Sequence, residues 1–267
     1  MLDEPSSGDL WQSGNAYEPY VGRWSRLVAP RFLDWLAARP ESRWVDVGCG
    51  TGALTHAIVE NEQPRSVLGI DRSEGFISFA REHVRDTRAT FETGNAQALP
   101  AESDSCDAVV CGLVLNFVPR PISAVLEFRR VLRPGGVAGA YVWDYVGEMQ
   151  MMRYFWDAAI TLDPGAAELD EGRRCNICQP EPLGDLFRVA GFRQVEVIAI
   201  DVATVFADFD DYWTPFLRGQ APAPAYAVSL SAARRETLRE QIRRSLPPRD
   251  DGSIHLVARA WAVKGRT

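Results

Sequence analysis

The chain has 267 residues, of which 46% are hydrophobic and 24% are charged, a composition typical of a globular protein. Its formal net charge of −7, together with the lack of Lys/Arg-rich runs, argues against nucleic acid or an anionic membrane surface as a partner. No apolar run approaches the roughly 20 residues that a membrane-spanning helix needs, and the acidic start at 1–5 lacks the apolar core of a signal peptide. We therefore expect a cytoplasmic protein.

The five cysteines are an odd number for this length and predict no disulfide framework. Cys175 and Cys178 form a C-x-x-C pair, but a zinc site needs two more ligands. We expect the other three, Cys49, Cys106 and Cys111, in the core of a sheet or in its turns. We therefore expect no metal site and interpret the pair as two ordinary thiols in a loop, with redox chemistry as the alternative.

A polar arm at 1–15 precedes a helical pattern over 20–39, and short β-rich runs then alternate with helical patterns. The alternation predicts right-handed crossovers and a mainly parallel sheet. The expected strands are 43–47, 66–70, 90–93, 106–111 and 137–143, and the expected helices between them are 53–62, 74–86 and 122–132.

The last third of the chain departs from this alternation. β-rich runs at 194–206 and 253–263 are expected to be neighbouring strands at the sheet edge. Between them, at about 208–248, lies an aromatic segment followed by an Arg/Glu-rich helical pattern. A further insertion, at about 147–180, separates the fifth strand from the next helix.

The strongest motif is the run W-V-D-V-G-C-G-T-G at 44–52, a buried strand leading into a glycine turn that opens a helix. Its glycines, Gly48, Gly50 and Gly52, permit positive φ and the close approach of a ligand, and free N–H groups at the helix start add polar contacts. The G-x-G-x-G spacing differs from the G-x-G-x-x-G of dinucleotide-binding folds. A tight turn without a ligand is the alternative.

With Asp46 two residues before the first glycine, this run resembles the first motif of class I S-adenosylmethionine-dependent methyltransferases. More narrowly, the chain is similar to the small-molecule methyltransferases of ubiquinone and menaquinone biosynthesis, over roughly 17–192. The resemblance implies S-adenosylmethionine as the cofactor. It also implies that the cofactor is held by Asp46, Gly48, Cys49, Gly50 and Gly52.

Asp71 ends the second expected strand, 23 residues after Gly48. A carboxylate there can accept hydrogen bonds from both ribose hydroxyls, with capping of the next helix as the alternative. The adjacent Arg72 is included in the cofactor set. The resemblance also implies that Phe76 packs near the adenine, and simple packing of the helix on the sheet is equally compatible with the sequence.

The third match, 94–100, begins Gly94-Asn95-Ala96. Relatives usually carry Asp at the position of Asn95, where it accepts a hydrogen bond from the adenine amino group. The amide oxygen of Asn keeps such a contact in neutral form. Asn95 and Ala96 therefore join the expected cofactor set, and a turn without a ligand is the alternative.

The run 104–118 resembles the fourth strand and its exit loop, where the methionine part of the cofactor meets the substrate. There the resemblance implies that Leu113 lines the cofactor pocket and that Asn116 faces the reacting centre or packs beneath it. Upstream, 17–25 resembles a cap over the methionine end and adds Tyr17 and Arg23, although Arg23 reads equally well as a surface charge. Pro134-Gly135-Gly136 predicts a structural turn.

The acceptor is less well marked. The chain lacks the Pro-Cys nucleophile of cytosine-C5 enzymes and the Asn/Asp-Pro-Pro-Tyr of amino-directed enzymes, which favours a small organic acceptor. No histidine is a compelling general base, and no catalytic residue is assigned. Packing of the insertions is the alternative for every residue of the expected substrate set, which is Asn116, Trp143, Tyr145, Tyr212 and Trp213.

We therefore predict an α/β, Rossmann-like methyltransferase sheet of seven strands in the order 3-2-1-4-5-7-6, with strand 7 antiparallel. Residues 1–40 are expected to form an arm and cap helix, and 41–267 the methyltransferase domain with both insertions. The expected reaction is methyl transfer from S-adenosylmethionine to an O, N or C nucleophile. A non-catalytic S-adenosylmethionine-binding sensor or scaffold and an NAD-linked oxidoreductase are the alternatives, and a homodimer is left open.

Overall fold

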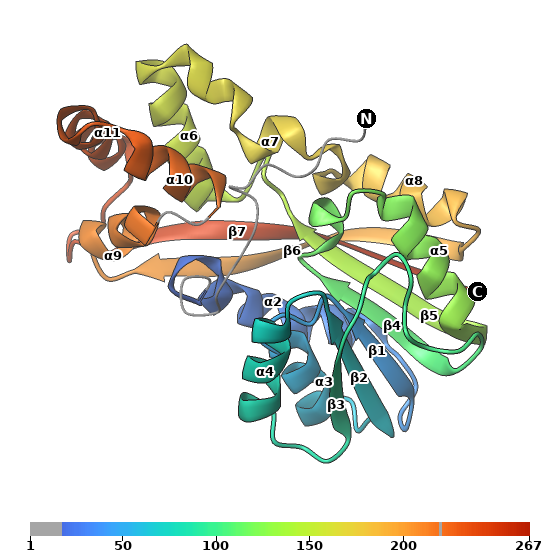
Figure 1. Ribbon diagram of the computed structural model, residues 1–267. Helices are drawn as coiled ribbons and strands as arrows, with labels where there is room; N and C mark the ends of the chain where they lie inside the picture. Colours follow the sequence, from blue (N-terminus) through green and yellow to red (C-terminus); the bar gives the residue numbers. More distant parts are fainter. Residues whose placement is uncertain (1–17, 219–220) are drawn as a thin grey trace. The chain divides into compact units, whose positions relative to one another are not determined.

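The computed structural model describes residues 18–218 and 221–267. Its centre is one seven-stranded sheet in the order β3-β2-β1-β4-β5-β7-β6, which confirms the predicted order (Figure 1). The strands are β1 (Arg43–Val47), β2 (Ser66–Asp71), β3 (Ala89–Thr93), β4 (Cys106–Gly112), β5 (Leu132–Trp143), β6 (Arg193–Phe206) and β7 (Ile254–Arg266).

The inner strands are parallel and apolar. Val45 of β1 lies opposite Leu68 of β2 on one side and Val109 of β4 on the other. Four of the five β1 residues are buried, as expected for a parallel strand covered on both faces. The short apolar runs of the sequence are therefore the centre of the sheet.

Strand β7 runs antiparallel to β5, as predicted. The amide of Thr267 donates to the carbonyl of Gly136, and the amide of Asp144 donates to the carbonyl of Arg259. Residues later in β5 thus pair with residues earlier in β7, which is the antiparallel arrangement.

Helices connect the strands at the predicted places. In the first half the structure has η2 (Glu18–Gly22), α2 (Arg23–Leu36), α3 (Ala53–Asn61), α4 (Glu74–His83), η3 (Leu115–Phe117) and α5 (Pro121–Val131). In the second half it has α6 (Gln150–Leu162), η4 (Pro164–Glu168), α7 (Glu171–Arg174), η5 (Asn176–Cys178), α8 (Pro180–Val189), α9 (Phe209–Trp213), η6 (Thr214–Arg218), α10 (Pro222–Ser229) and α11 (Ala232–Ser245).

The turn predicted at Pro134-Gly135-Gly136 lies inside β5 instead of before it. Leu132 pairs with Cys106 and Val137 pairs with Ala108, so one residue of β4 is matched by four of β5. The surplus residues form a bulge in which Gly135 takes φ +80°. The glycines are needed for a bend, as predicted, but the strand begins on the far side of it.

The described residues fall into two compact units. We call the first the sheet unit; it comprises Ser25–Val142, Gln179–Ile200 and Ala260–Thr267. We call the second the insertion unit; its described residues are 18–24, 143–178, 201–218 and 221–259. No helix of the described residues is long and apolar enough to cross a membrane.

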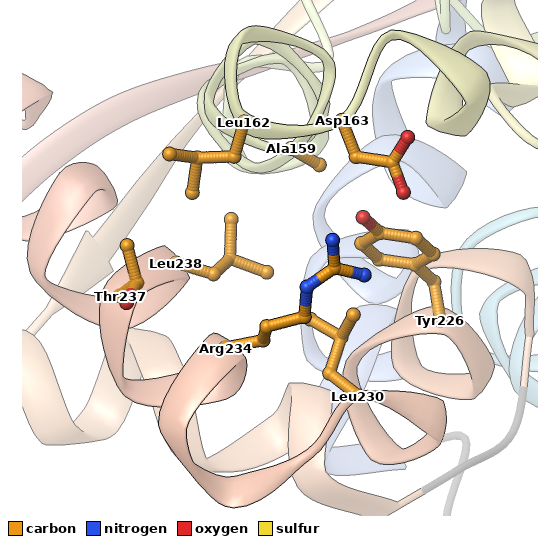
Figure 2. A pocket seen from close by; sticks show the side chains of 8 residues that line it. All are labelled: Ala159, Leu162, Asp163, Tyr226, Leu230, Arg234, Thr237 and Leu238. Atoms are coloured by element: carbon orange, nitrogen blue, oxygen red, sulfur yellow. The ribbon is translucent and has the colours of Figure 1, made fainter.

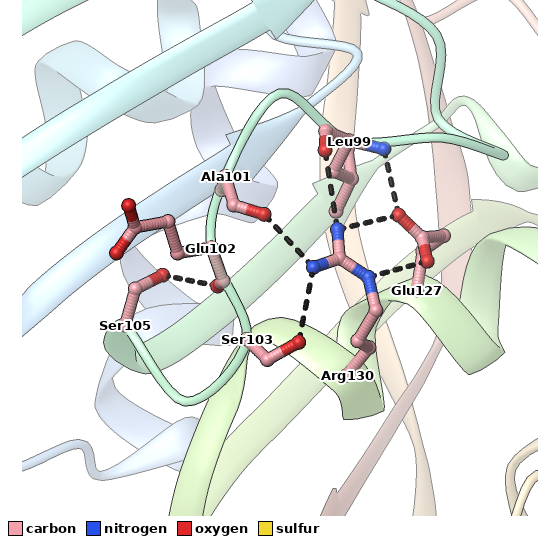
Figure 3. A network of polar contacts seen from close by, with 7 residues as sticks. All are labelled: Leu99, Ala101, Glu102, Ser103, Ser105, Glu127 and Arg130. Atoms are coloured by element: carbon pink, nitrogen blue, oxygen red, sulfur yellow. Dashed lines mark hydrogen bonds and ion pairs between the residues drawn. The ribbon is translucent and has the colours of Figure 1, made fainter.

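In the sheet unit, an arginine ties the loop before β4 to α5 (Figure 3). The Arg130 guanidinium binds the carboxylate of Glu127 and donates to the carbonyls of Leu99 and Ala101. The second role of Glu127 is to accept the amide of Leu99, at 2.8 Å. The hydrogen bonds from Arg130 hold the pKa of Glu127 below its usual value. This network fixes the chain between β3 and β4.

The insertion unit has an aromatic core of its own. Phe155 of α6 stacks on Phe216 of η6, with ring centroids 4.6 Å apart, and Tyr20 and Tyr212 contact the same Phe216 ring. The hydroxyl of Tyr212 donates to the carbonyl of Met151 at 2.7 Å. The aromatic residues of the two sequence insertions are thus packed together in one core.

Candidate functional site

The glycine loop after β1 is built on three positive φ angles, +74° at Gly48, +52° at Gly50 and +86° at Gly52. The amides of Gly48 and Cys49 both donate to the carbonyl of Ile70, which holds the loop against the end of β2. A Cβ at Gly48 would lie 2.6 Å from the Val114 side chain, whereas one at Gly50 would have nothing within 4 Å. The backbone at Gly50 therefore faces open space, as a ligand-binding glycine requires.

The carboxylate of Asp71 joins the exits of the first two strands. Its Oδ2 accepts the amide of Gly50 at 3.0 Å, and its Oδ1 accepts the amide of Ser73 at 2.9 Å. The carbonyl of Asp71 also accepts the amide of Gly94, which brings in the exit of β3. Since a carboxylate has about four acceptor positions, Asp71 keeps capacity for a ligand.

Asp46 is buried beside this loop. Its Oδ2 accepts the Thr55 hydroxyl of α3 at 2.6 Å. Burial raises the pKa of Asp46 to about 7, an effect that the Thr55 hydrogen bond opposes and the negative charge of Asp71 reinforces. Burial likewise raises the pKa of Asp71. Burial thus disfavours the charged form of both neighbouring carboxylates.

The pKa of the Cys49 thiol is raised by burial and by Asp46 and Asp71, so Cys49 is a protonated side chain. Its thiol lies near Gly69 of β2, where an added Cβ would come within 3.1 Å of the sulfur. Cys49 therefore packs the loop onto the sheet, and its contribution toward a ligand would come from its backbone.

Beyond Asp71, the structure places Arg72 as an exposed residue and Phe76 as a half-buried one in the first turn of α4. The Ser73 hydroxyl accepts the amide of Phe76, which makes Ser73 the N-cap of this helix. Phe76 therefore lies one turn from Asp71 with part of its ring exposed.

Asn95 forms a side-chain turn after β3. Its Oδ1 accepts the amide of Gln97 at 2.9 Å, and its carbonyl accepts the amide of Ala98. The side chain is exposed, and Ala96 between these residues is half-buried. The turn that the sequence offered as the alternative is present.

The exit of β4 completes this edge of the sheet. Leu113 adopts φ +60°, unusual for a branched aliphatic residue, and its amide donates to the carbonyl of Tyr141. The side chain of the next residue, Val114, packs against Gly48 so closely that a Cβ on Gly48 would clash with it. In the η3 turn that follows, the Nδ2 of Asn116 is buried and has no hydrogen-bond partner among the described residues.

The remaining predicted residues lie in the insertion unit. Arg23 binds Asp211 at 3.0 Å and lies over the rings of Trp24 and Phe206. The expected substrate residues there are all buried, which matches the packing alternative: Trp143, Tyr145, Tyr212 and Trp213. Tyr17 lies outside the described residues.

The insertion unit also contains a pocket of about 130 Å³ between the end of α6 and helices α10 and α11 (Figure 2). The carboxylate of Asp163, the hydroxyl of Tyr226 and the guanidinium of Arg234 face it, over an apolar wall of Leu162 and Leu238. None of the residues predicted from the sequence lines this pocket.

Several buried polar groups were not predicted, Thr55 and Glu171 among them. Thr55 could have been suspected, because it shares a helix face with Ile58 and Val59 and so points toward the sheet. Glu171 carries no such signal. Its Oε2 accepts the Trp156 indole N–H at 2.5 Å, and burial raises its pKa to about 7.

Comparison with known proteins agrees with this geometry. A family model described as "Methyltransferase domain" matches residues 45–139, from β1 into β5. The Ubiquinone biosynthesis O-methyltransferase of Hahella chejuensis is 36% identical over 107 residues, 39% of this chain and 44% of that protein. The 2-phytyl-1,4-naphtoquinone methyltransferase of Synechococcus elongatus is 31% identical over 120 residues, 43% of this chain and 50% of that protein. The match thus spans half or less of these relatives.

The fold is also that of the phosphoethanolamine N-methyltransferase 2 of Haemonchus contortus, solved with S-adenosyl-L-methionine. The TM-score is 0.58 at 17% identity, over 95% of this chain and 56% of that one. The sheet order, the glycine loop joined to Asp71 and the matched family model lead to one conclusion. Residues 45–139 match a methyltransferase domain, on a sheet with the strand order of the class I methyltransferase fold, and these findings support S-adenosylmethionine as the cofactor.

Proposed function

We propose that the protein transfers the methyl group of S-adenosylmethionine to a small organic acceptor. The observation that carries the proposal is the hydrogen bond between Asp71 and Gly50, beside a Gly50 backbone that faces open space. A ribose seated there would meet the remaining acceptor positions of the Asp71 carboxylate, while the loop could approach it without a side chain in the way.

When bound, the cofactor supplies a methyl group on a positively charged sulfonium, which a nucleophile attacks in line. The chain's part is to bind and orient. Asp71 and Gly50 would hold the ribose, Asn95 and Phe76 the adenine, and Leu113 the methionine end. The charge of Asp71 and the polarity of buried Asp46 favour a cationic cofactor over its neutral product.

Asn116 supports an acceptor that carries an oxygen or another hydrogen-bond acceptor. A buried N–H without a partner costs about 1–3 kcal/mol, and a bound acceptor that takes this hydrogen bond removes the cost. Such a contact would orient the nucleophile at the exit of β4. We therefore assign Asn116 to acceptor positioning.

For the insertion unit we propose a contribution to acceptor specificity. Trp213 packs against Phe209 and Phe216 within the aromatic core of the unit. A rigid aromatic core fixes the positions of the groups around it. The insertion residues would therefore affect acceptor specificity indirectly, by maintaining the shape of the unit.

The test combines binding and turnover. Calorimetry with S-adenosylmethionine, S-adenosylhomocysteine and NAD should give binding of the first two and none of NAD; binding of NAD alone would indicate an oxidoreductase. Incubation with labelled S-adenosylmethionine and a panel of small phenols, quinols, amines and carboxylic acids should then give a labelled product. Tight cofactor binding without turnover on any acceptor class would favour the sensor or scaffold.

A further inference from the structure

The C-x-x-C pair of the insertion unit has a geometry that the proposed methyl transfer does not use. Cys175 directly precedes the 3-10 turn η5 and Cys178 ends it, and the amide of Cys178 donates to the carbonyl of Cys175 at 3.0 Å. This backbone bond turns the chain back between the two cysteines, close enough for their side chains to interact.

The two sulfurs differ in access. Cys178 is fully buried, whereas Cys175 is half-buried, so a small reagent reaches Cys175 first. The hydrogen bond with Cys175, and then burial, raises the pKa of Cys178. This arrangement pairs one accessible thiol with one sheltered thiol directly beside it, which is the layout of an attacking and a resolving cysteine.

We propose that Cys175 and Cys178 are an oxidation site that closes to an intramolecular disulfide under peroxide. The Cys175 thiolate attacks one oxygen of hydrogen peroxide, which forms a sulfenic acid and releases one water after proton transfer. The Cys178 sulfur then attacks the Cys175 sulfur and displaces the hydroxyl as a second water. In total, two thiols and one peroxide give one disulfide and two waters, and the two electrons come from the sulfurs.

The acidic surroundings disfavour the Cys178 thiolate in the reduced pair. The charges of Asp144 and Glu171 act on Cys178, and Tyr145 lies within electrostatic reach of both cysteines. Carboxylates beside a sulfur disfavour the thiolate, so the reduced pair lacks the thiolate stabilisation that makes some C-x-x-C disulfides strongly oxidising.

The experiment uses the full chain, reduced, freed of reductant and treated with a small excess of hydrogen peroxide. Thiols counted in denaturant should fall from five to three. Trypsin cleavage after Arg174 and Arg188 releases both cysteines on the single peptide 175–188, whose mass should be 2 Da lower without alkylation. An unchanged peptide, or thiols lost instead from Cys49, Cys106 or Cys111, would overturn the proposal.

Three variants complete the test. Cys178→Ser should stop at the Cys175 sulfenic acid, which dimedone traps, while Cys175→Ser should keep its four thiols under the same treatment. Cys106→Ser, a matched control within the sheet, should fall from four thiols to two. Cofactor affinity, measured in parallel, reports on the proposed methyl transfer and is independent of the thiol count, so either proposal can fail alone.

Discussion

The carboxylate of Asp71 accepts the backbone amide of Gly50 at 3.0 Å, so the acid that ends β2 is bonded to the middle glycine of the loop that ends β1. The two motifs, 21 residues apart, are one structural unit. A change at Asp71 must therefore alter the loop as well as any ligand contact, and a test of its role needs a control that loses a comparable backbone bond.

Asp107 is that control, since its carboxylate accepts the amide of Arg43 at 2.8 Å elsewhere in the sheet unit. We expect Asp71→Ala to weaken S-adenosylhomocysteine binding by about 2–3 kcal/mol, the scale of hydrogen bonds to a charged group. Asp107→Ala should leave the dissociation constant unchanged. Both should lower the free energy of unfolding, by about 1–3 kcal/mol for each backbone N–H that loses its partner, which is one in Asp107→Ala and two in Asp71→Ala. Calorimetry and urea unfolding measure the two effects, and equal affinity losses would make Asp71 purely structural.

Gly50→Ala tests the open space over the loop. An L-residue at φ +52° costs about 1–2 kcal/mol, but its Cβ meets no protein atom within 4 Å. Gly135→Ala in the β5 bulge is the matched control, because Gly135 also has a positive φ, +80°, and an added Cβ would also have nothing within 4 Å. We expect similar losses of unfolding free energy and a loss of S-adenosylhomocysteine affinity of tenfold or more for Gly50→Ala alone. Undiminished binding by Gly50→Ala would place the cofactor elsewhere.

Asn95→Asp should be tolerated, with cofactor affinity equal or better. The Oδ1 of Asn95 already accepts the amide of Gln97, and a carboxylate keeps that turn while offering a stronger acceptor to the adenine amino group. Asn95→Ala removes both contacts and should bind more weakly. If instead Asn95→Asp binds much more weakly in calorimetry, Asn95 acts as a donor and the adenine assignment is wrong.

Asp46 should make stability fall as pH rises. Its pKa is about 7 in the folded chain and near 4 when unfolded, so between these values the folded state holds a proton that the unfolded state has lost. Unfolding free energy should therefore drop by about 4 kcal/mol from pH 4 to pH 7 through this group.

The Asp46→Asn variant keeps an oxygen that can accept the Thr55 hydroxyl. Its unfolding free energy should lack the part of the pH dependence that comes from Asp46. Glu171→Gln should remove a separate share, because the pKa of Glu171 is also about 7. Urea unfolding at a series of pH values gives both slopes. Parallel curves for the wild type and Asp46→Asn would show that Asp46 is charged throughout this range.

Trp213→Ala should raise the KM for the acceptor more than that for the cofactor, if the insertion unit sets specificity. The side chain is 4% exposed, so its removal also costs about 3–5 kcal/mol of stability. Trp213→Phe, which keeps an aromatic ring between Phe209 and Phe216, serves as the comparison. Equal changes in both KM values would assign Trp213 to stability alone.

The sheet could be predicted because its signals are local. β1 occupies the expected residues 43–47, since an apolar run ends there in a glycine, and the other strands differ only at their ends. The glycine loop and Asp71 were likewise recognisable from residue type and spacing. The hydrogen bond between Asp71 and Gly50 could not be predicted. The spacing of a motif indicates at the end of which strand a residue lies, but it does not indicate which neighbouring group its side chain contacts.

Long-range partners lay beyond sequence reasoning. Arg23 binds Asp211 across 188 positions, and Trp156 meets Glu171 in a segment without periodicity. The sequence analysis expected the aromatic residues of the insertions either to contact the substrate or to pack against one another. Amino-acid composition cannot distinguish these two roles. The structure shows that these side chains are buried, and their role in acceptor specificity stays a prediction.

The bulge at the start of β5 also makes the sheet tolerant of changes in chain length. Pairing resumes at Ala108 and Val137 and runs on to Gly112 and Tyr141, so the register beside Leu113 is set after the surplus residues. Pro134 and Gly135 are exposed. A short peptide label inserted between them would lengthen a segment that already loops out, which makes this position an attachment point for a fluorophore or affinity tag remote from the cofactor edge.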